Sequence, residues 1–135
     1  MKKRQPMTGT SMIYGVGTDI SDVRRFVKWV RTPSLISRFF NERERQETGT
    51  EAFLSQHYAV RFAAKEAFSK ALGTGLSGFD LRDVFILKNE DGKPELHTSG
   101  TASEVLEARC GKNARVCVSL SHEKEFAVAF VVIEV

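Results

Sequence analysis

The sequence predicts a single α+β domain in which one long central helix packs on a mostly antiparallel sheet. Three observations favour this fold class. Residues 51–72 form the longest helical pattern and are apolar on most sides, which is typical of a helix surrounded by other elements. The residues from 81 onward are rich in short strand patterns separated by turn residues. The 135 residues contain no repeat, linker or low-complexity tract, and this length suffices for one domain with its own core.

The first part of the predicted domain is a strand followed by two short helices. A β-rich run begins at Met12 and ends at Asp19, and Ser21 is a plausible N-cap for the helix DVRRFVKWVR that follows. The apolar residues of this helix recur at helical spacing, and its basic residues lie off that stripe. Ser34 can cap a second helix that runs to Phe40, and the charged residues after it form a turn or a short helix.

The long helix and the strand-rich region follow. Thr50 is the predicted N-cap of the long helix, and Gly73 ends it. The last strand, FAVAFVVIEV, is apolar enough to be buried on both faces. Beyond the long helix we expect strands at 81–88, 94–98, 115–121 and 126–135, and a short helix at 101–110.

Composition limits the class of protein. The net charge is only +3, but basic residues crowd the segment 24–45, which indicates an acidic partner. The chain has two cysteines, no secretory signal and no apolar run of membrane-spanning length, so we expect a reducing cytoplasm and no membrane. Residues 1–11, MKKRQPMTGTS, lack periodicity and are interpreted as a flexible extension or a remnant of cloning, which leaves residues 12–135 as the domain.

The stretch RFAAKEAFSKALGTG places charges in an apolar helix. Glu66 and Lys70 have the spacing of an exposed ion pair, which would contribute about 0.3 to 0.5 kcal/mol. A helix that is apolar nearly all round would instead remove both groups from water, which is costly unless an opposite charge meets them. A metal ion or a phosphate could supply that charge.

Asp19 is the second candidate carboxylate. It follows GVGT at the end of the first strand, where an aspartate is either a turn or capping residue or a ligand. Gly15 and Gly17 allow close backbone approach, although GxG without a third glycine is no dinucleotide fingerprint. Asp19 and Glu66 together would suit Mg²⁺, which takes one or two protein carboxylates and leaves its other positions to water and phosphate oxygens.

Two further segments could contact an anion. His122 lies in SLSHEKE at a predicted turn, where a lone histidine is usually solvated but could hydrogen-bond to or neutralise a phosphate. The glycines of GTGLSG, with Gly73 and Gly75 among them, either form a flexible exit loop or offer backbone N–H groups to an anion. No histidine or cysteine pair has the spacing of transition-metal ligands.

The chain resembles the holo-acyl-carrier-protein synthase family, the small phosphopantetheinyl transferases, in three stretches: GVGTDI, RFAAKEAFSKALGTG and VSLSHEKEFAVAFVV. The resemblance covers residues 12–135 in the family's order and spacing, and the middle stretch is its most specific part. It implies the 4′-phosphopantetheinyl transferase-like fold and a Mg²⁺-dependent enzyme of fatty acid biosynthesis. Such enzymes move the 4′-phosphopantetheine arm of coenzyme A to a serine hydroxyl of an apo acyl carrier protein and release adenosine 3′,5′-bisphosphate.

The resemblance also implies roles for individual residues. Asp19 and Glu66 match the family's metal ligands, and Lys70 matches a lysine that contacts the diphosphate. The serine proton could pass to Glu66, to a water on the metal or to His122, and the sequence does not choose among them. Lys65 would serve either the phosphates or the protein surface. The residues expected to bind coenzyme A are Lys65, Lys70, Gly73, Gly75 and His122.

The family also suggests partners for the basic segment. Its members dock the acidic carrier protein on the basic helix after the first strand, and they are typically homotrimers with active sites between subunits. A trimer would explain how so small a chain encloses coenzyme A. The residues that match the docking helix are Arg24, Arg25, Lys28 and Arg31.

Two readings from other classes compete with this enzyme. A nucleic-acid-binding module would explain the arginines, but Trp29, Phe39 and Phe40 lie on apolar helical stripes and no groove-reading motif is present, so we expect no nucleic acid partner. A trimeric scaffold that binds coenzyme A without turnover is the other alternative.

Overall fold

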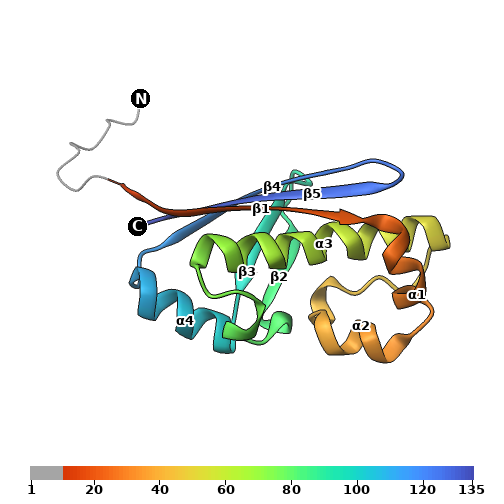
Figure 1. Ribbon diagram of the computed structural model, residues 1–135, viewed down its shortest axis with the longest axis horizontal. Coiled ribbons are helices and arrows are strands. Elements are labelled where there is room, and N and C mark those ends of the chain that lie inside the picture. The colour runs from red at the N-terminus through yellow and green to blue at the C-terminus, as the bar shows by residue number, and fades with distance from the viewer. Residues whose placement is uncertain (1–10) are drawn as a thin grey trace.

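The computed structural model describes residues 11–135, and it confirms the predicted α+β class (Figure 1). The predicted N-terminal extension, residues 1–11, lies outside the described residues except for its last one. An antiparallel sheet lies along one side of the long helix, and the shorter helices lie on its other side (Figure 1).

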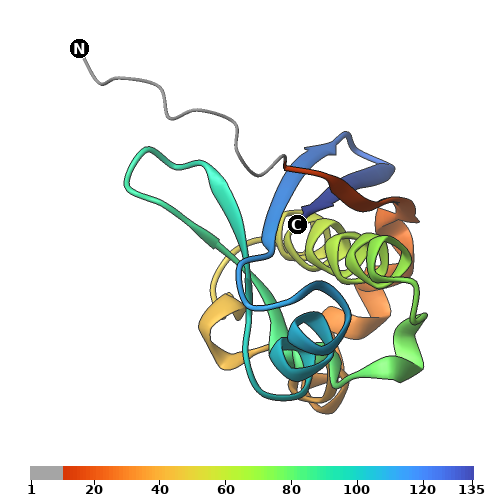
Figure 2. The same cartoon turned by 90° about the vertical axis from the view of Figure 1, so that its left-hand side faces the viewer.

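The strands form two antiparallel sheets. In the first sheet, β5 (Phe126–Glu134) lies between β1 (Ile13–Asp22) and β4 (Arg115–His122). In the second, β2 (Val84–Lys88) pairs with β3 (Pro94–Thr98) as a hairpin. The hairpin begins later than predicted because its first expected residues form a 3₁₀ turn. Its tip extends away from the body of the protein (Figure 2).

The long helix begins and ends where the sequence predicts. It is α3 (Glu51–Leu72), and the Thr50 hydroxyl accepts the N–H of Phe53 at 3.1 Å. Gly73 ends it in the left-handed region with a φ of 86°, which favours glycine. The other helices are α1 (Phe26–Val30), α2 (Pro33–Phe39) and α4 (Gly100–Cys110), with 3₁₀ turns at Val23–Arg25, Glu42–Glu44, Leu76–Gly78 and Leu81–Asp83.

Two glycines let β1 lie directly on α3. A Cβ on Gly17 would lie 1.9 Å from the carbonyl oxygen of Ala67, and one on Gly15 would lie 2.0 Å from that of Ala71. Any larger residue would push the strand away from the helix. Because side chains alternate along a strand, Asp19 faces the helix as these glycines do.

An aromatic cluster joins α1 and α2 to α3. Phe26 and Phe62 are buried, and the Trp29 ring centroid lies 4.9 Å from that of Phe26 and 5.3 Å from that of Phe62. Phe39 and Phe40 complete the cluster. These rings pack on each other, so they do not form the exposed stacking surface that single-stranded nucleic acid requires.

Two predicted helix caps are wrong. β1 continues beyond Asp19, and Ser21 is a buried strand residue rather than an N-cap. Asp22 takes the capping role, since its side chain accepts the N–H of Arg24. At α2 the N-cap position is Thr32, not Ser34, and a proline occupies the first turn, where its missing N–H has no cost.

Within a single chain, only one face of the last strand is buried. The alternate residues Ala127, Ala129, Val131 and Ile133 are buried against α3, but the opposite side of β5 is exposed. The apolar run did not reveal this, because both of its faces are apolar. The exposed apolar surface of the sheet, here called the outer face, comprises Val16 and Ile20 of β1 and Phe126, Val128 and Phe130 of β5.

Candidate active site

β1 and α3 bring Asp19 and Glu66 together, although these residues lie far apart in the sequence. The Lys70 ammonium group lies 3.3 Å from Oδ1 of Asp19 and donates to the carbonyl oxygen of Thr18 at 3.0 Å. The buried Ser21 hydroxyl donates to Oδ2 of Asp19 at 3.3 Å. Lys70 itself is half exposed, so it keeps contact with the surrounding solution.

The charges around Glu66 favour a cation at this place. Burial raises the pKa of Glu66 and the charge of Asp19 raises it further, while Arg25 and Lys70 oppose the rise. A cation between the two carboxylates would relieve their repulsion. Each Asp19 oxygen that accepts one hydrogen bond keeps another lone pair for a ligand bond.

The donor set fits Mg²⁺ better than a transition metal. Within residues 11–135 no three His, Cys, Asp or Glu side chains are grouped so that they could hold a metal ion. A cation at Asp19 and Glu66 would therefore have two carboxylate ligands from the described chain and would need oxygen atoms from water or substrate. Mg²⁺ is commonly bound in this way.

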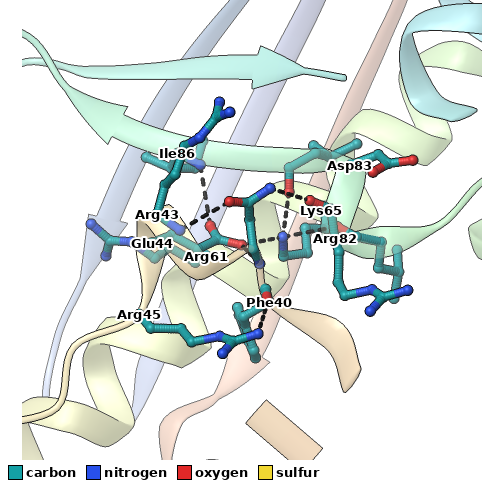
Figure 3. Close-up of polar contacts among 12 residues, drawn as sticks. Phe40, Arg43, Glu44, Arg45, Arg61, Lys65, Arg82, Asp83 and Ile86 are labelled. Carbon is teal, nitrogen blue, oxygen red and sulfur yellow. Dashed lines mark hydrogen bonds and ion pairs between the residues drawn. The ribbon is translucent and has the colours of Figure 1, made fainter. Parts of the chain in front are cut away.

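Lys65 does not belong to this site, and the prediction that it contacts coenzyme A is wrong. Its side chain is fully buried, and its ammonium group donates to a Glu44 carboxylate oxygen and to the carbonyl oxygens of Leu81 and Val84 (Figure 3). These three acceptors use its three N–H groups, so no donor is left for a phosphate. Burial lowers the pKa of Lys65, and the charge of Glu44 opposes that effect.

His122 lies on a different part of the same chain. It is the last residue of β4, and β5 separates it from β1, since His122 is opposite Ala127 and Ala127 is opposite Ser21. Its side chain lines a cavity of about 360 Å³ between the first half of α3, the β2–β3 hairpin and the end of β4. The basic and apolar residues of this cavity include Phe53, His57, Val60, Arg61, Ile86, Lys88 and Pro94.

The cavity holds two basic side chains, His57 and Arg61, whose pKa values are lowered by burial. Burial, together with the nearby charge of Arg61, lowers the pKa of His57 from 6.5 to about 4. Nε2 of His57 donates to the carbonyl oxygen of Glu44 at 2.6 Å, so the neutral ring keeps its hydrogen there. Burial also lowers the pKa of Arg61, whose buried Nε has no hydrogen-bond partner among residues 11–135. A bound anion would neutralise the positive charge of this surface.

The pKa of His57 predicts how stability depends on pH. Between pH 6.5 and about 4 the unfolded chain protonates His57 and the folded protein does not, so the free energy of unfolding should fall as pH decreases through this window. This one group contributes at most about 1.4 kcal/mol per pH unit. Urea unfolding of the wild type and of His57→Gln at several pH values measures the effect. The variant should lose stability less steeply; identical slopes would mean that His57 is not held neutral.

The glycine loop after α3 divides into two parts. The N–H of Gly73 donates to the carbonyl oxygen of Ser69 at 2.9 Å, so it closes the helix and is not free for an anion. The prediction that Gly73 binds coenzyme A is therefore wrong for its N–H group. Gly75 has a φ of 70° and open space beside its α-carbon. Its predicted contact with coenzyme A stays a prediction.

All four residues of the predicted docking helix are exposed, but their surroundings differ. Arg24 is paired with Asp22 at 2.8 Å, and Arg31 is paired with Glu51 at 2.7 Å. The Arg25 guanidinium lies over the rings of Phe26, Trp29 and Phe62, and its charge reaches Glu66. For Lys28 no ion pair occurs within the described chain.

Sequence patterns missed the cavity and the partner of Lys65. Arg61 and Lys88 belong to different elements, and nothing in their spacing indicates that they face the same space. Glu44 lies in the charged run ERERQE, which is typical of a solvated turn. The only signal was the cost of a buried Lys65, which requires an opposite charge somewhere in the fold.

The fold and the site place the chain among the 4′-phosphopantetheinyl transferases. A sequence model of the 4′-phosphopantetheinyl transferase superfamily matches residues 15–131, and the chain belongs to this family. Among its relatives, a holo-[acyl-carrier-protein] synthase of Treponema pallidum is 46% identical over 123 residues, which are 91% of this chain and 97% of the relative. That of Geotalea daltonii is 44% identical over 126 residues, which are 91% of this chain and 99% of the relative.

Solved structures agree with these relatives. The crystal structure of a holo-(acyl-carrier-protein) synthase from Bacillus anthracis in complex with CoA (3′,5′-ADP) has 37% identity and a TM-score of 0.75, and the match covers 91% of this chain and 97% of that one. The synthase from Neisseria meningitidis has 35% identity and a TM-score of 0.77, with 92% and 100% covered. The resemblance seen in the three sequence stretches is thereby confirmed.

Proposed function

We propose that this protein is a holo-acyl-carrier-protein synthase. It transfers the 4′-phosphopantetheine group of coenzyme A to a serine hydroxyl of an apo acyl carrier protein and releases adenosine 3′,5′-bisphosphate. The observation that carries the proposal is the meeting of Asp19 and Glu66 beside Lys70 in a chain of this family. Incubation with coenzyme A, Mg²⁺ and an apo acyl carrier protein tests it, with the pantetheine adduct detected by mass spectrometry. A scaffold without turnover would give no adduct.

Charge neutralisation and positioning account for the reaction that we propose. Asp19 and Glu66 would hold Mg²⁺, which when bound would offset negative charge on the diphosphate as the bisphosphate leaves. Lys70 is held at Asp19 by one hydrogen bond and at Thr18 by another, which leaves an N–H free for a diphosphate oxygen. Glu66 and His122 are the side chains of this chain that could take the proton of the attacking serine.

We propose that the His122 cavity takes the nucleotide end of coenzyme A. Arg61, Lys88 and His122 would meet the phosphates of adenosine 3′,5′-bisphosphate, and apolar side chains such as Phe53 and Val60 would contact the base. Neither Asp19 nor Glu66 lines this cavity. A single coenzyme molecule would therefore connect the cavity to the carboxylates of a neighbouring subunit.

We propose that the chain assembles as a homotrimer, and the exposed outer face of the sheet supports contact between its copies. It exposes Ile20, Val128 and Phe130 side by side on paired strands, with 63%, 37% and 44% of their surface accessible. Contiguous exposed apolar surface of this kind marks an interaction site, and a second copy of the chain offers the same surface.

Disruption of the outer face should separate the subunits. Phe130→Glu places a charge in the middle of the proposed interface, and we expect monomers together with a loss of activity, because each active site would need two chains. Light scattering and turnover measured on the same samples test this. The control is Glu90→Lys in the exposed hairpin turn. Trimers that persist in Phe130→Glu would place the interface elsewhere.

Charge reversal at Lys28 should weaken docking of the carrier protein and little else. Lys28 is exposed on the basic helix, so Lys28→Glu is expected to raise KM for the carrier protein about tenfold at low salt and less at high salt. KM for coenzyme A should not change. Steady-state kinetics at two salt concentrations measure this, with Lys112→Glu as the exposed control. An unchanged carrier-protein KM would remove Lys28 from the docking surface.

The predicted location stays a prediction. Among the described residues, none of the helices combines the length and the hydrophobicity that crossing a membrane requires. The cytoplasm is the location that the two unpaired cysteines and the proposed substrates favour.

A further inference from the structure

The buried pair Glu44–Lys65 has no role in the reaction described above. The two side chains are 0% and 1% exposed, and they join a turn before α3 to the middle of that helix (Figure 3). A buried ion pair is weak evidence for stability, because removing two charges from water offsets their attraction. What distinguishes this pair is the number of backbone groups that it holds in place.

These backbone groups belong to two separate segments. Lys65 donates to the carbonyl oxygens of Leu81 and Val84, which lie at the start of the hairpin. The Glu44 carboxylate accepts the N–H of Asn41 at 3.0 Å and the N–H of Ile86 at 3.2 Å. The pair therefore ties the 41–44 turn and the hairpin to α3.

The pair replaces a neighbouring strand at the free edge of β2. In this two-stranded sheet β3 pairs with one edge of β2, and Val84 and Ile86 direct backbone groups toward the other. Such an edge normally needs another strand or a covering element. Here the side chains of Glu44 and Lys65 form the hydrogen bonds that a neighbouring strand would otherwise form with this edge. This fastening adds to the hydrogen bonds that Asp83 makes with Ser99 and Thr101 at the base of the hairpin, whose tip extends away from the body (Figure 2).

Glu44 also contacts both walls of the His122 cavity. Its carbonyl oxygen accepts the hydrogen on Nε2 of His57, which belongs to the α3 wall. Its carboxylate accepts the N–H of Ile86, which belongs to the hairpin wall two residues before Lys88. Glu44 is thus hydrogen-bonded to both walls of the cavity.

We propose that the Glu44–Lys65 pair is a positioning unit for the cavity. It holds the β2 wall at a fixed distance from α3, so that Lys88 and Arg61 meet the phosphates of the same nucleotide. The inference rests on the proposed function of the cavity. Two charged groups bind one anion well only when both are already in place, since otherwise binding must also order the hairpin.

Glu44→Asp is the most direct test. Aspartate keeps the charge that Lys65 needs, but it is one methylene shorter and cannot also reach the N–H of Ile86. We expect the Kd for adenosine 3′,5′-bisphosphate, measured by calorimetry without metal, and the KM for coenzyme A to rise about fivefold or more. The kcat and the carrier-protein KM should change less than about twofold. Hydrogen exchange at the Ile86 amide should accelerate. The matched control is Glu42→Asp, the same change on the exposed side of the turn.

The outcomes separate this inference from the cavity assignment. If folded Glu44→Asp binds the bisphosphate as the wild type does, while Arg61→Gln with Lys88→Gln binds it weakly, the positioning role is wrong. If the Arg61 and Lys88 variant also binds normally, the cavity assignment itself is wrong. Should Glu44→Asp not fold, the same criterion applies to the uncharged pair Glu44→Gln with Lys65→Gln. Failure of both to fold would overturn the proposal in favour of a purely structural role.

Discussion

Replacement of Asp19 by Asn, or of Glu66 by Gln, is expected to lower kcat/KM for pantetheine transfer about a thousandfold or more, equivalent to roughly 4 kcal/mol of transition-state stabilisation. Burial raises the pKa of Glu66 and the charge of Asp19 raises it further, so the two carboxylates repel each other. Each amide keeps the size of the side chain but removes the negative charge that would hold Mg²⁺. Product formation by mass spectrometry over a range of Mg²⁺ concentrations measures the loss.

Asp19→Asn and Glu66→Gln should fold normally, because the two carboxylates are expected to bind a ligand and not to stabilise the fold. Removing one of two like charges relieves repulsion, so the melting temperature should stay constant or rise. Asp22→Asn is the matched control, because Asp22 is a carboxylate of the same strand that caps the 3₁₀ turn. It should keep activity within a few fold. Full activity in either Asp19→Asn or Glu66→Gln would remove the metal assignment.

The central helix was predictable because several local signals agree on it. Thr50 caps α3, Gly73 ends it, and the apolar pattern between them continues without interruption. The pairing of Asp19 with Glu66 was also predicted, from a charge in an apolar helix and from an aspartate at the end of the first strand, which together suit Mg²⁺. The structure shows how the two carboxylates meet: Gly15 and Gly17 allow the strand to lie directly on the helix.

Long-range partners and surface exposure could not be predicted from these patterns. Lys65 and Lys70 lie on one helix and look alike in sequence, but one meets Glu44 inside the protein and the other meets Asp19 at its surface. Which lysine is buried depends on where the 41–44 turn packs, and no local pattern contains that information. Likewise the two faces of β5 have similar hydrophobicity, and only the position of α3 decides which one is covered.

The two lysines of α3 should respond oppositely to the same substitution. Lys65→Met removes the cation that meets buried Glu44, so we expect the free energy of unfolding to fall by about 3 to 5 kcal/mol. Such a loss is a large part of the stability of a typical domain. Lys70→Met removes a half-exposed cation, so its stability should change by less than about 1 kcal/mol. Its kcat/KM should nevertheless fall about a hundredfold, because the diphosphate loses a charged donor.

Urea unfolding followed by Trp29 fluorescence, together with steady-state kinetics, measures both effects. Every sample needs the same chain concentration, because assembly of subunits adds to apparent stability. Each lysine serves as the other's control, since residue type, helix and substitution are identical. A stable Lys65→Met would mean that Glu44 is not a buried charge in solution. A fully active Lys70→Met would mean that the diphosphate is bound elsewhere, and the proposed site would then keep only its two carboxylates.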